Sequence, residues 1–209
     1  LPVPGIYTGD DLRPYREWLP ATSLEASTPL GGSFYSRNIE DYYMTPWDVG
    51  YGHIVKFDHE FVGRAALEEM ARAPRRRKVT LVWRREDVVK VFDSLFQPWP
   101  RYKYIELPLS TYGWQYDEVR NERGEGIGVS TYCGYSTNEA AMLSLAVVDV
   151  AYAEPGTEGL VVWGEPGGGA RKPNVERHEQ LLIRATVGPV PIAEPARQFQ
   201  KASLVTHRP

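Results

Sequence analysis

The alternation of apolar and polar positions is clearest between residues 62 and 96, where its period changes twice. In "VGRAALEEMARA" (62–73), Leu67 and Met70 recur at helical spacing and Pro74 follows, which predicts a helix that ends there. The β-branched run "RKVTLVW" (77–83) predicts a strand. A second helix is expected over 85–96, because its apolar residues fall on one side: Val88, Val91, Phe92 and Leu95.

Beyond this helix, short apolar runs alternate with Gly, Pro and Asn at the spacing typical of a β-barrel or sandwich. The strand-like runs lie at 102–109, 124–136, 139–153, 156–166 and 174–191. The glycine-rich stretch 164–173 is expected to be a flexible hairpin tip. We therefore expect an α+β protein whose C-terminal half is mainly β.

The first part of the chain has no sustained period and many Pro, Ser, Thr and Gly residues, so it is expected to be irregular, with a short helix around 11–21. Its aromatic side chains must nevertheless pack on something. The stretch "YGHIVKF" (51–57) predicts an extended strand, and the polar residues Asp58, His59 and Glu60 predict a turn.

Composition narrows the function classes. A chain of 209 residues with net charge −3 has no overall basic field, so neither nucleic acid nor a membrane is an expected partner. One cysteine allows no disulfide within the chain, and no apolar run approaches the ~20 residues of a membrane span. We expect a cytoplasmic protein. The chain starts at Leu1, followed by Pro2 and Pro4, which indicates a cut through a linker: either the protein was processed or it is the C-terminal part of something longer.

Candidate chemical groups are few. The arginines between Arg72 and Arg85 could clamp phosphate, polyglutamate or nucleic acid, but a solvated charge run is favoured. The glycine-rich stretch lacks the ending of a phosphate loop, and the four histidines lack metal-ligand spacing. Cys133 is expected to be a core residue, and "ERHE" (176–179) an exposed face of a strand. No catalytic residue and no metal site are predicted.

The segment "DYYMTPWDVGYGHIVKFDHEFVGRAAL" resembles the aminomethyltransferase family, to which the glycine-cleavage T-protein belongs. The match rests on these positions: Thr45, Pro46, Asp48, Gly50, Gly52, Val55, Lys56, Asp58, Phe61, Val62, Gly63, Arg64, Ala66 and Leu67. The stretch 124–150 is similar to a downstream segment of the same family. Within the family, the chain looks closest to tetrahydrofolate-dependent O-demethylases that act on vanillate, syringate or 3-O-methylgallate.

The resemblance implies two regions: 1–98 as the tail of the folate-binding region, and 99–209 as a C-terminal Greek-key β-barrel domain. It implies tetrahydrofolate as cofactor, no metal, and methyl transfer from a methoxy-aromatic acid of lignin. The candidates for folate contacts that line a central channel are Tyr35, Tyr43, Trp47, Tyr51 and Arg197, for which simple packing between domains is the favoured alternative role.

Arg64 is expected to tie its corner of the chain to a neighbouring domain. The resemblance also implies N-terminal domains that this chain lacks, so the chain alone is expected to be inactive, and self-association is possible. The alternatives are a glycine-cleavage-type aminomethyltransferase and a non-catalytic barrel that serves as an interaction module.

Overall fold

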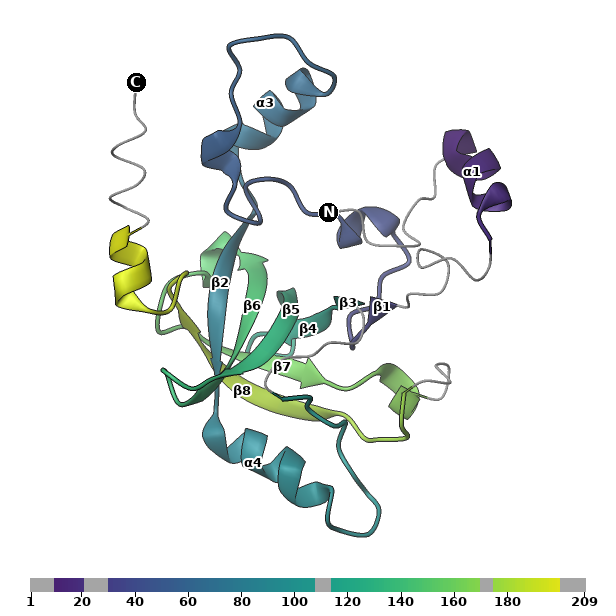
Figure 1. The fold of residues 1–209 in the computed structure, drawn as a ribbon, viewed down its shortest axis with the longest axis vertical. Coiled ribbons are helices and arrows are strands. Elements are labelled where there is room, and N and C mark those ends of the chain that lie inside the picture. The colour runs from purple at the N-terminus through teal and green to yellow at the C-terminus, as the bar shows by residue number, and fades with distance from the viewer. Residues whose placement is uncertain (1–9, 21–29, 108–113, 170–174, 200–209) are drawn as a thin grey trace.

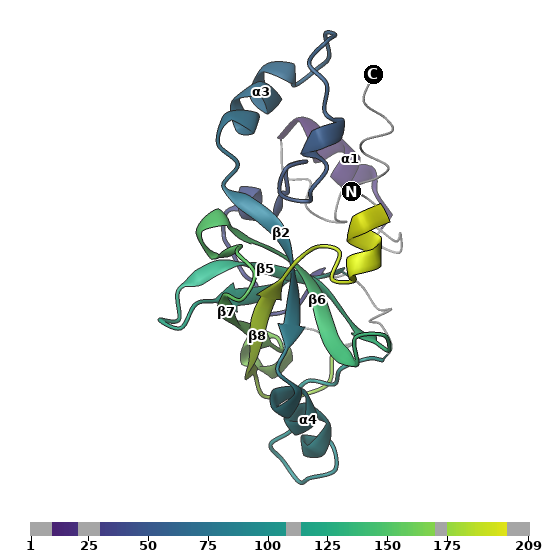
Figure 2. The same ribbon diagram turned by 90° about the vertical axis from the view of Figure 1, so that its left-hand side faces the viewer.

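The computed structural model describes residues 10–20, 30–107, 114–169 and 175–199. Its centre is a closed barrel with the strand order β2–β6–β5–β4–β7–β8, in which β8 also pairs with β2 (Figures 1 and 2). The strands are β2 (Arg76–Trp83), β4 (Asp117–Arg120), β5 (Gly126–Ser136), β6 (Ala141–Asp149), β7 (Glu158–Trp163) and β8 (Leu181–Gly188). All pairings are antiparallel.

The connection from β6 back to β7 determines the topology of the barrel. Strands β4, β5 and β6 form a meander, and β7 then lies beside β4, which is the Greek-key arrangement. The expected class, mainly β with a Greek-key barrel, is confirmed. Strand β2 lies on the N-terminal side of position 98, so the barrel uses residues from both predicted regions.

The barrel interior holds the core, because alternate side chains of each strand point inward. Two tryptophans, Trp83 and Trp163, meet edge to face there, with ring centroids 5.3 Å apart. The other large side chains that are fully buried are aliphatic: Leu81, Ile105, Ile183, Val91, Val119, Val148 and Val161. Cys133 is part of the same core, as expected.

Helix α4 (Arg85–Ser94) lies across one end of the barrel (Figures 1 and 2). Val91 on this helix is fully buried, and Val88 and Phe92 pack against the core. Asp87 in its first turn accepts hydrogen bonds from the Arg184 side chain, at 2.8 Å, and fastens the helix to β8. The helix predicted over 85–96 and the strand predicted over 77–83 are both confirmed.

The N-terminal part of the chain forms short elements. These are η1 (Asp10–Leu12), α1 (Arg13–Trp18), β1 (Leu30–Gly31) and η2 (Ile39–Tyr42). Strand β1 pairs in parallel with β3 (Trp114–Gln115), outside the barrel. Beside this pair, Tyr116 is buried under Phe34, Tyr42 and Met44, so some of the aromatic residues of this region have a small core of their own.

The strand predicted over 51–57 is wrong. Residues Gly52–Ile54 instead form a 3-10 turn, η3, closed by hydrogen bonds from Ile54 N–H to Tyr51 O and from Val55 N–H to Gly52 O. The backbone groups of this run are satisfied locally, and no strand of the described chain pairs with it. Helix α3 (Arg64–Arg72) follows, as predicted, and stands away from the barrel on the side opposite α4 (Figures 1 and 2).

Two other runs differ from the expected strands. In 102–109, the described residues make only an isolated bridge between Tyr102 and Glu179, and 108–109 lie outside the described ranges. The run 139–153 ends in the 3-10 turn η4 (Val150–Tyr152). The glycine-rich stretch contains η5 (Pro166–Gly169) within the connection between the paired strands β7 and β8, as a hairpin predicts.

In the described part of the chain, no helix combines the length and the apolar character that crossing a bilayer requires. Within the same ranges, no group of His, Cys, Asp and Glu side chains is arranged to hold a metal ion.

Candidate functional site

Three of the five predicted folate contacts, Tyr43, Trp47 and Tyr51, lie on one loop, residues 43–51, beside the start of β2. The loop is a compact turn that Asp48 organises: its carboxylate accepts a hydrogen bond from Thr45 N–H at 2.8 Å, and Asp48 N–H donates to Thr45 Oγ1 at 3.2 Å. These reciprocal bonds hold the three aromatic residues on a defined backbone.

Arg76 clamps this loop to the barrel. Its guanidinium donates to the Asp48 carboxylate at 2.8 Å and to the Tyr43 carbonyl at 2.7 Å. The Asp48 side chain is only 5% exposed, so loss of Arg76 would leave a buried carboxylate without its cation. The Arg76–Asp48 pair therefore joins a motif residue of the loop to the first barrel strand.

Lys78 follows Arg76 on the same face of β2 and lies under the loop. Its ammonium is 5.3 Å from the centre of the Tyr51 ring, a cation–π contact. Gly52 touches the Trp47 indole so closely that a Cβ there would lie 2.5 Å from Trp47 Cδ1. The glycine is thus required for a close approach to a side chain of its own loop.

The structure places Tyr35 and Arg197 on other segments. Tyr35 is 71% exposed, between β1 and η2. Arg197 belongs to a helical turn over 194–199, and its guanidinium donates to the carbonyls of Pro191 and Ile192. Their role as folate contacts stays a prediction, as does that of the three loop residues.

The contacts that the structure gives for Arg64 all lie within its own corner of the chain. It donates to the carboxylates of Glu60 and Glu68, at 2.6 and 2.8 Å, and to the His59 carbonyl at 3.1 Å. A contact of Arg64 with a neighbouring domain stays a prediction.

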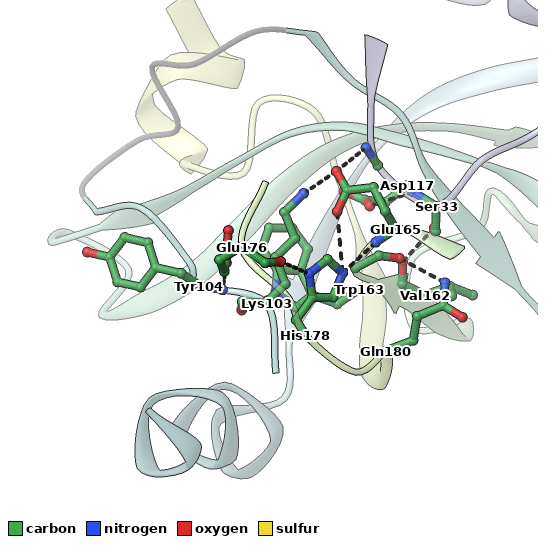
Figure 3. Close-up of polar contacts among 12 residues, drawn as sticks. Ser33, Lys103, Tyr104, Asp117, Val162, Trp163, Glu165, Glu176, His178 and Gln180 are labelled. Carbon is green, nitrogen blue, oxygen red and sulfur yellow. Dashed lines mark hydrogen bonds and ion pairs between the residues drawn. The ribbon is translucent and has the colours of Figure 1, made fainter. Parts of the chain in front are cut away.

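A second polar cluster, which sequence reasoning missed, lies at the junction of η5, residue 103 and the segment after β1 (Figure 3). The ammonium of Lys103 donates to Glu165 Oε1 at 2.7 Å, and Gly32 N–H donates to the same oxygen at 3.1 Å. The exposed fractions of the two side chains are 8% and 4%. Burial alone would raise the pKa of Glu165, but the Lys103 charge and the hydrogen bonds from Lys103 and Gly32 together hold that pKa below its usual value.

His178 completes this cluster, and its position corrects the prediction of an exposed strand over 176–179. Its ring is buried, and Glu165 N–H donates to Nε2 at 2.9 Å (Figure 3). Nδ1 lies 2.8 Å from the Glu176 carbonyl, so we assign the proton to Nδ1 and a neutral ring. His178 thus fixes the connection between β7 and β8 against Glu165.

Ser33 ties the segment after β1 to the same end of the barrel. Its hydroxyl donates to the Val162 carbonyl at 2.6 Å and accepts from Glu118 N–H at 2.8 Å, while Ser33 N–H donates to Asp117 at 3.1 Å (Figure 3). The preceding Gly32 has φ +93°, and a Cβ on it would lie 2.2 Å from the Tyr116 carbonyl oxygen. The whole cluster is structural in character: it is buried and joins segments that are distant in sequence.

Other candidate groups do not form a catalytic centre. Burial raises the pKa of the Cys133 thiol to about 12, so this thiol is not a nucleophile near neutral pH. Much of the arginine run is paired with carboxylates: besides Arg76, Arg77 lies 2.9 Å from Glu154, and Arg84 lies 3.6 Å from Glu158. These pairs favour a structural and surface role for the run over a clamp for polyanions.

No model of a known protein family matches the chain. The chain is 48% identical to syringate O-demethylase of Sphingobium sp. over 197 residues, which cover 94% of this chain and 42% of that protein. It is 36% identical to sesamin methylene transferase of Sinomonas sp. over 160 residues, or 71% of this chain and 33% of that protein.

Aminomethyltransferases are also similar. The protein of that name from Streptomyces coelicolor is 35% identical over 141 residues, which cover 66% of this chain and 31% of the relative. The crystal structure of glycine cleavage system aminomethyltransferase T from Bartonella henselae matches with a TM-score of 0.44 and 20% identity, covering 72% of this chain and 32% of that one. The chain thus spans less than half the length of the curated relatives it matches, and over that length its sequence is aminomethyltransferase-like.

Proposed function

We propose that this chain is the C-terminal, barrel-bearing part of a tetrahydrofolate-dependent methyltransferase that O-demethylates methoxy-aromatic acids derived from lignin. The observation that carries the proposal is the 48% identity to syringate O-demethylase over 94% of this chain. The proposal includes a methoxy-aromatic acid and folate as small-molecule partners, and a cytoplasmic location.

The main alternative is an aminomethyltransferase of the glycine-cleavage type, which the 35% identity over 66% of the chain supports. A barrel that serves only as an interaction module is the remaining alternative, and it predicts that no activity depends on these residues. The first experiment below separates all three.

The loop 43–51 offers groups that fit a folate. Tyr43 and Tyr51 are 48% and 55% exposed, and the exposed part of the Tyr51 ring can stack on a flat heterocycle. The Lys78 ammonium beside Tyr51 is a cation of the kind that binds a carboxylate tail. Bound folate would supply the acceptor nitrogen for the methyl group.

For the chain's own residues, the role that we propose is positioning. Ether cleavage requires that the donor and the acceptor be held in line and that the leaving phenolate be stabilised. The Arg76–Asp48 clamp keeps the loop on β2, so that Tyr43, Trp47 and Tyr51 present fixed surfaces to a ligand. In this proposal, the groups that stabilise the phenolate lie outside this chain.

The function is tested by a chimera in which this chain replaces the matched region of syringate O-demethylase. We expect the chimera to convert syringate with tetrahydrofolate to the demethylated product and 5-methyltetrahydrofolate, both measured by chromatography, because the identity across the replaced region is 48%. We expect the isolated chain to give no turnover under the same conditions.

The matched control for that chimera carries the corresponding region of the Streptomyces coelicolor aminomethyltransferase. A folded chimera with this chain that is inactive on syringate would contradict the proposed O-demethylase. Activity in the aminomethyltransferase context alone would favour the first alternative, and a region that can be exchanged without any effect on either activity would favour the interaction module.

The folate contact is tested by Tyr51→Ala in the active chimera. We expect this substitution to weaken tetrahydrofolate binding by about tenfold or more, measured by calorimetric titration, because stacking on one aromatic ring contributes on the order of 1–3 kcal/mol. Tyr104→Ala is the control, since Tyr104 is similarly exposed, at 49%, and its backbone N–H donates to Glu176, outside the loop 43–51. Equal affinities for the two variants would remove Tyr51 from the folate site.

A further inference from the structure

A hollow lies beside η5, where the segment 177–180 leads into β8. Its volume is about 430 Å³, which is enough for a small molecule. It is lined by Trp99, by two glycines of η5 and by the residues 177–180. None of these residues belongs to the loop 43–51 or to the Arg76–Asp48 clamp, so the function proposed above leaves the hollow unexplained.

The backbone that carries the hollow is held firmly in place. His178 is the buried residue of the lining, at 2% exposed, and its ring accepts the hydrogen bond from Glu165 N–H (Figure 3). Glu179 N–H donates to the Arg101 carbonyl at 2.8 Å. A Cβ on Gly168 would lie 2.3 Å from the His178 carbonyl oxygen, so glycine is required for η5 to approach the segment this closely. The side chains on either side of His178 therefore start from a preorganised backbone.

Two opposite charges face the hollow and do not pair with each other. Arg177 and Glu179 are exposed on either side of the buried His178, an alternation that places their side chains on one side of the backbone. The Arg177 guanidinium lies 4.5 Å from the centre of the Trp99 ring, and this cation–π contact positions it. Within the described ranges, the structure gives neither Arg177 nor Glu179 an ion-pair partner.

A cation, an anion and an indole around one hollow match the groups of a zwitterion. The carboxylate of such a ligand accepts hydrogen bonds from the Arg177 guanidinium, whose fork of N–H donors suits it. The ligand's ammonium donates to the Glu179 carboxylate. Its side chain packs on Trp99, which is 46% exposed. Phosphate or another simple anion fits less well, because the Glu179 carboxylate repels it.

We propose that this hollow binds a free amino acid with an apolar or aromatic side chain. The inference does not rest on the proposed function, because it uses only the residues of the hollow. Binding is expected to fix the Arg177 and Glu179 side chains on opposite ends of the ligand, with the buried His178 unchanged beneath them.

The test is calorimetric titration of the 209-residue chain with L-phenylalanine. We expect saturable binding with a dissociation constant of about 1 mM or lower. Phenethylamine lacks the carboxylate and 3-phenylpropionate lacks the ammonium, so each is expected to bind at least about tenfold more weakly, having lost one charge-assisted contact. Glycine should also bind at least about tenfold more weakly, because it has no side chain to place on Trp99.

Substitutions assign the two ends of the ligand. Arg177→Met should weaken L-phenylalanine binding by about tenfold or more, and Arg177→Lys, which keeps the charge without the fork, should retain part of the affinity. Glu179→Gln should remove the preference for L-phenylalanine over 3-phenylpropionate. Arg123→Met is the control, because Arg123 is an exposed arginine outside the lining, 3.0 Å from Glu125, and its loss should leave the affinity unchanged.

Three results would overturn the proposal. The first is a titration with L-phenylalanine that gives no saturable heat. The second is equal affinity for L-phenylalanine and 3-phenylpropionate, which would make the ligand an aromatic anion. The third is binding that neither Arg177→Met nor Glu179→Gln changes, which would place the amino acid elsewhere on the chain. None of these results bears on the chimera experiment, so the two proposals stand or fall separately.

Discussion

Replacing Lys103 by methionine is expected to lower the free energy of unfolding by about 3–5 kcal/mol, measured by chemical denaturation near neutral pH. The Lys103 ammonium is 2.7 Å from Glu165 Oε1, and both side chains are almost completely buried. The substitution keeps the volume of the side chain but leaves a buried carboxylate that has lost its cation. Lys90→Met is the control, because Lys90 is exposed, and its effect should stay within about 0.5 kcal/mol.

The dependence of this loss on pH provides a second check. Since the pKa of Glu165 is lower in the folded chain than in the unfolded one, the ionised pair contributes stability above the unfolded pKa. This contribution declines as the pH falls through the folded pKa, so the cost of Lys103→Met should shrink in acid. Adding Glu165→Gln to Lys103→Met should recover part of the loss. A cost that is the same at all pH values would contradict the ion-pair account.

Trp163→Ala is expected to cost about 3–5 kcal/mol, the range for truncating a buried tryptophan. The Trp163 ring is 1% exposed, lies edge to face with Trp83, and donates from Nε1 to the Lys103 carbonyl at 2.8 Å. The substitution removes the ring from the barrel core and a hydrogen bond from the chain beside it. Thermal and chemical unfolding of the variant would measure the loss.

Two variants separate the contributions to that loss. Trp163→Phe keeps an aromatic ring but no N–H donor, so it should cost about 1–3 kcal/mol, the penalty for an unsatisfied buried carbonyl. Trp99→Ala should cost far less, because Trp99 is 46% exposed. If Trp163→Ala and Trp99→Ala had similar effects, Trp163 would not be an essential part of the core.

The elements that the sequence predicted well are those with strong periods. The strand over 77–83 and the helix over 85–96 carry apolar residues at intervals that match their structures, β2 and α4. Strand β4, "DEVR", was missed because three of its four residues are charged. It is nevertheless a barrel strand. Its charged Asp117 is buried and accepts a hydrogen bond from Ser33 N–H.

The polar clusters could not be predicted, because their partners come from distant positions. Lys103 and Glu165 are 62 residues apart, and Arg76 and Asp48 are 28 residues apart. His178 was expected on an exposed face because charged neighbours surround it, but its ring is turned inward by the hydrogen bond from Glu165 N–H. Local patterns report periodicity and turn chemistry, whereas such pairs depend on the topology of the barrel.

The order of strands in the barrel has a consequence for synthesis of the chain. The first barrel strand, β2, pairs with the last, β8, so the barrel cannot close before residues 181–188 have been made. During translation, the edge of β2 that pairs with β8 therefore stays open while about a hundred further residues emerge from the ribosome, and its other edge is open until β6 has been made. Long-range closure of this kind makes folding slow relative to helical domains. A chain that stopped short of β8 would present two open sheet edges, which makes it a natural target for chaperones and a source of aggregation.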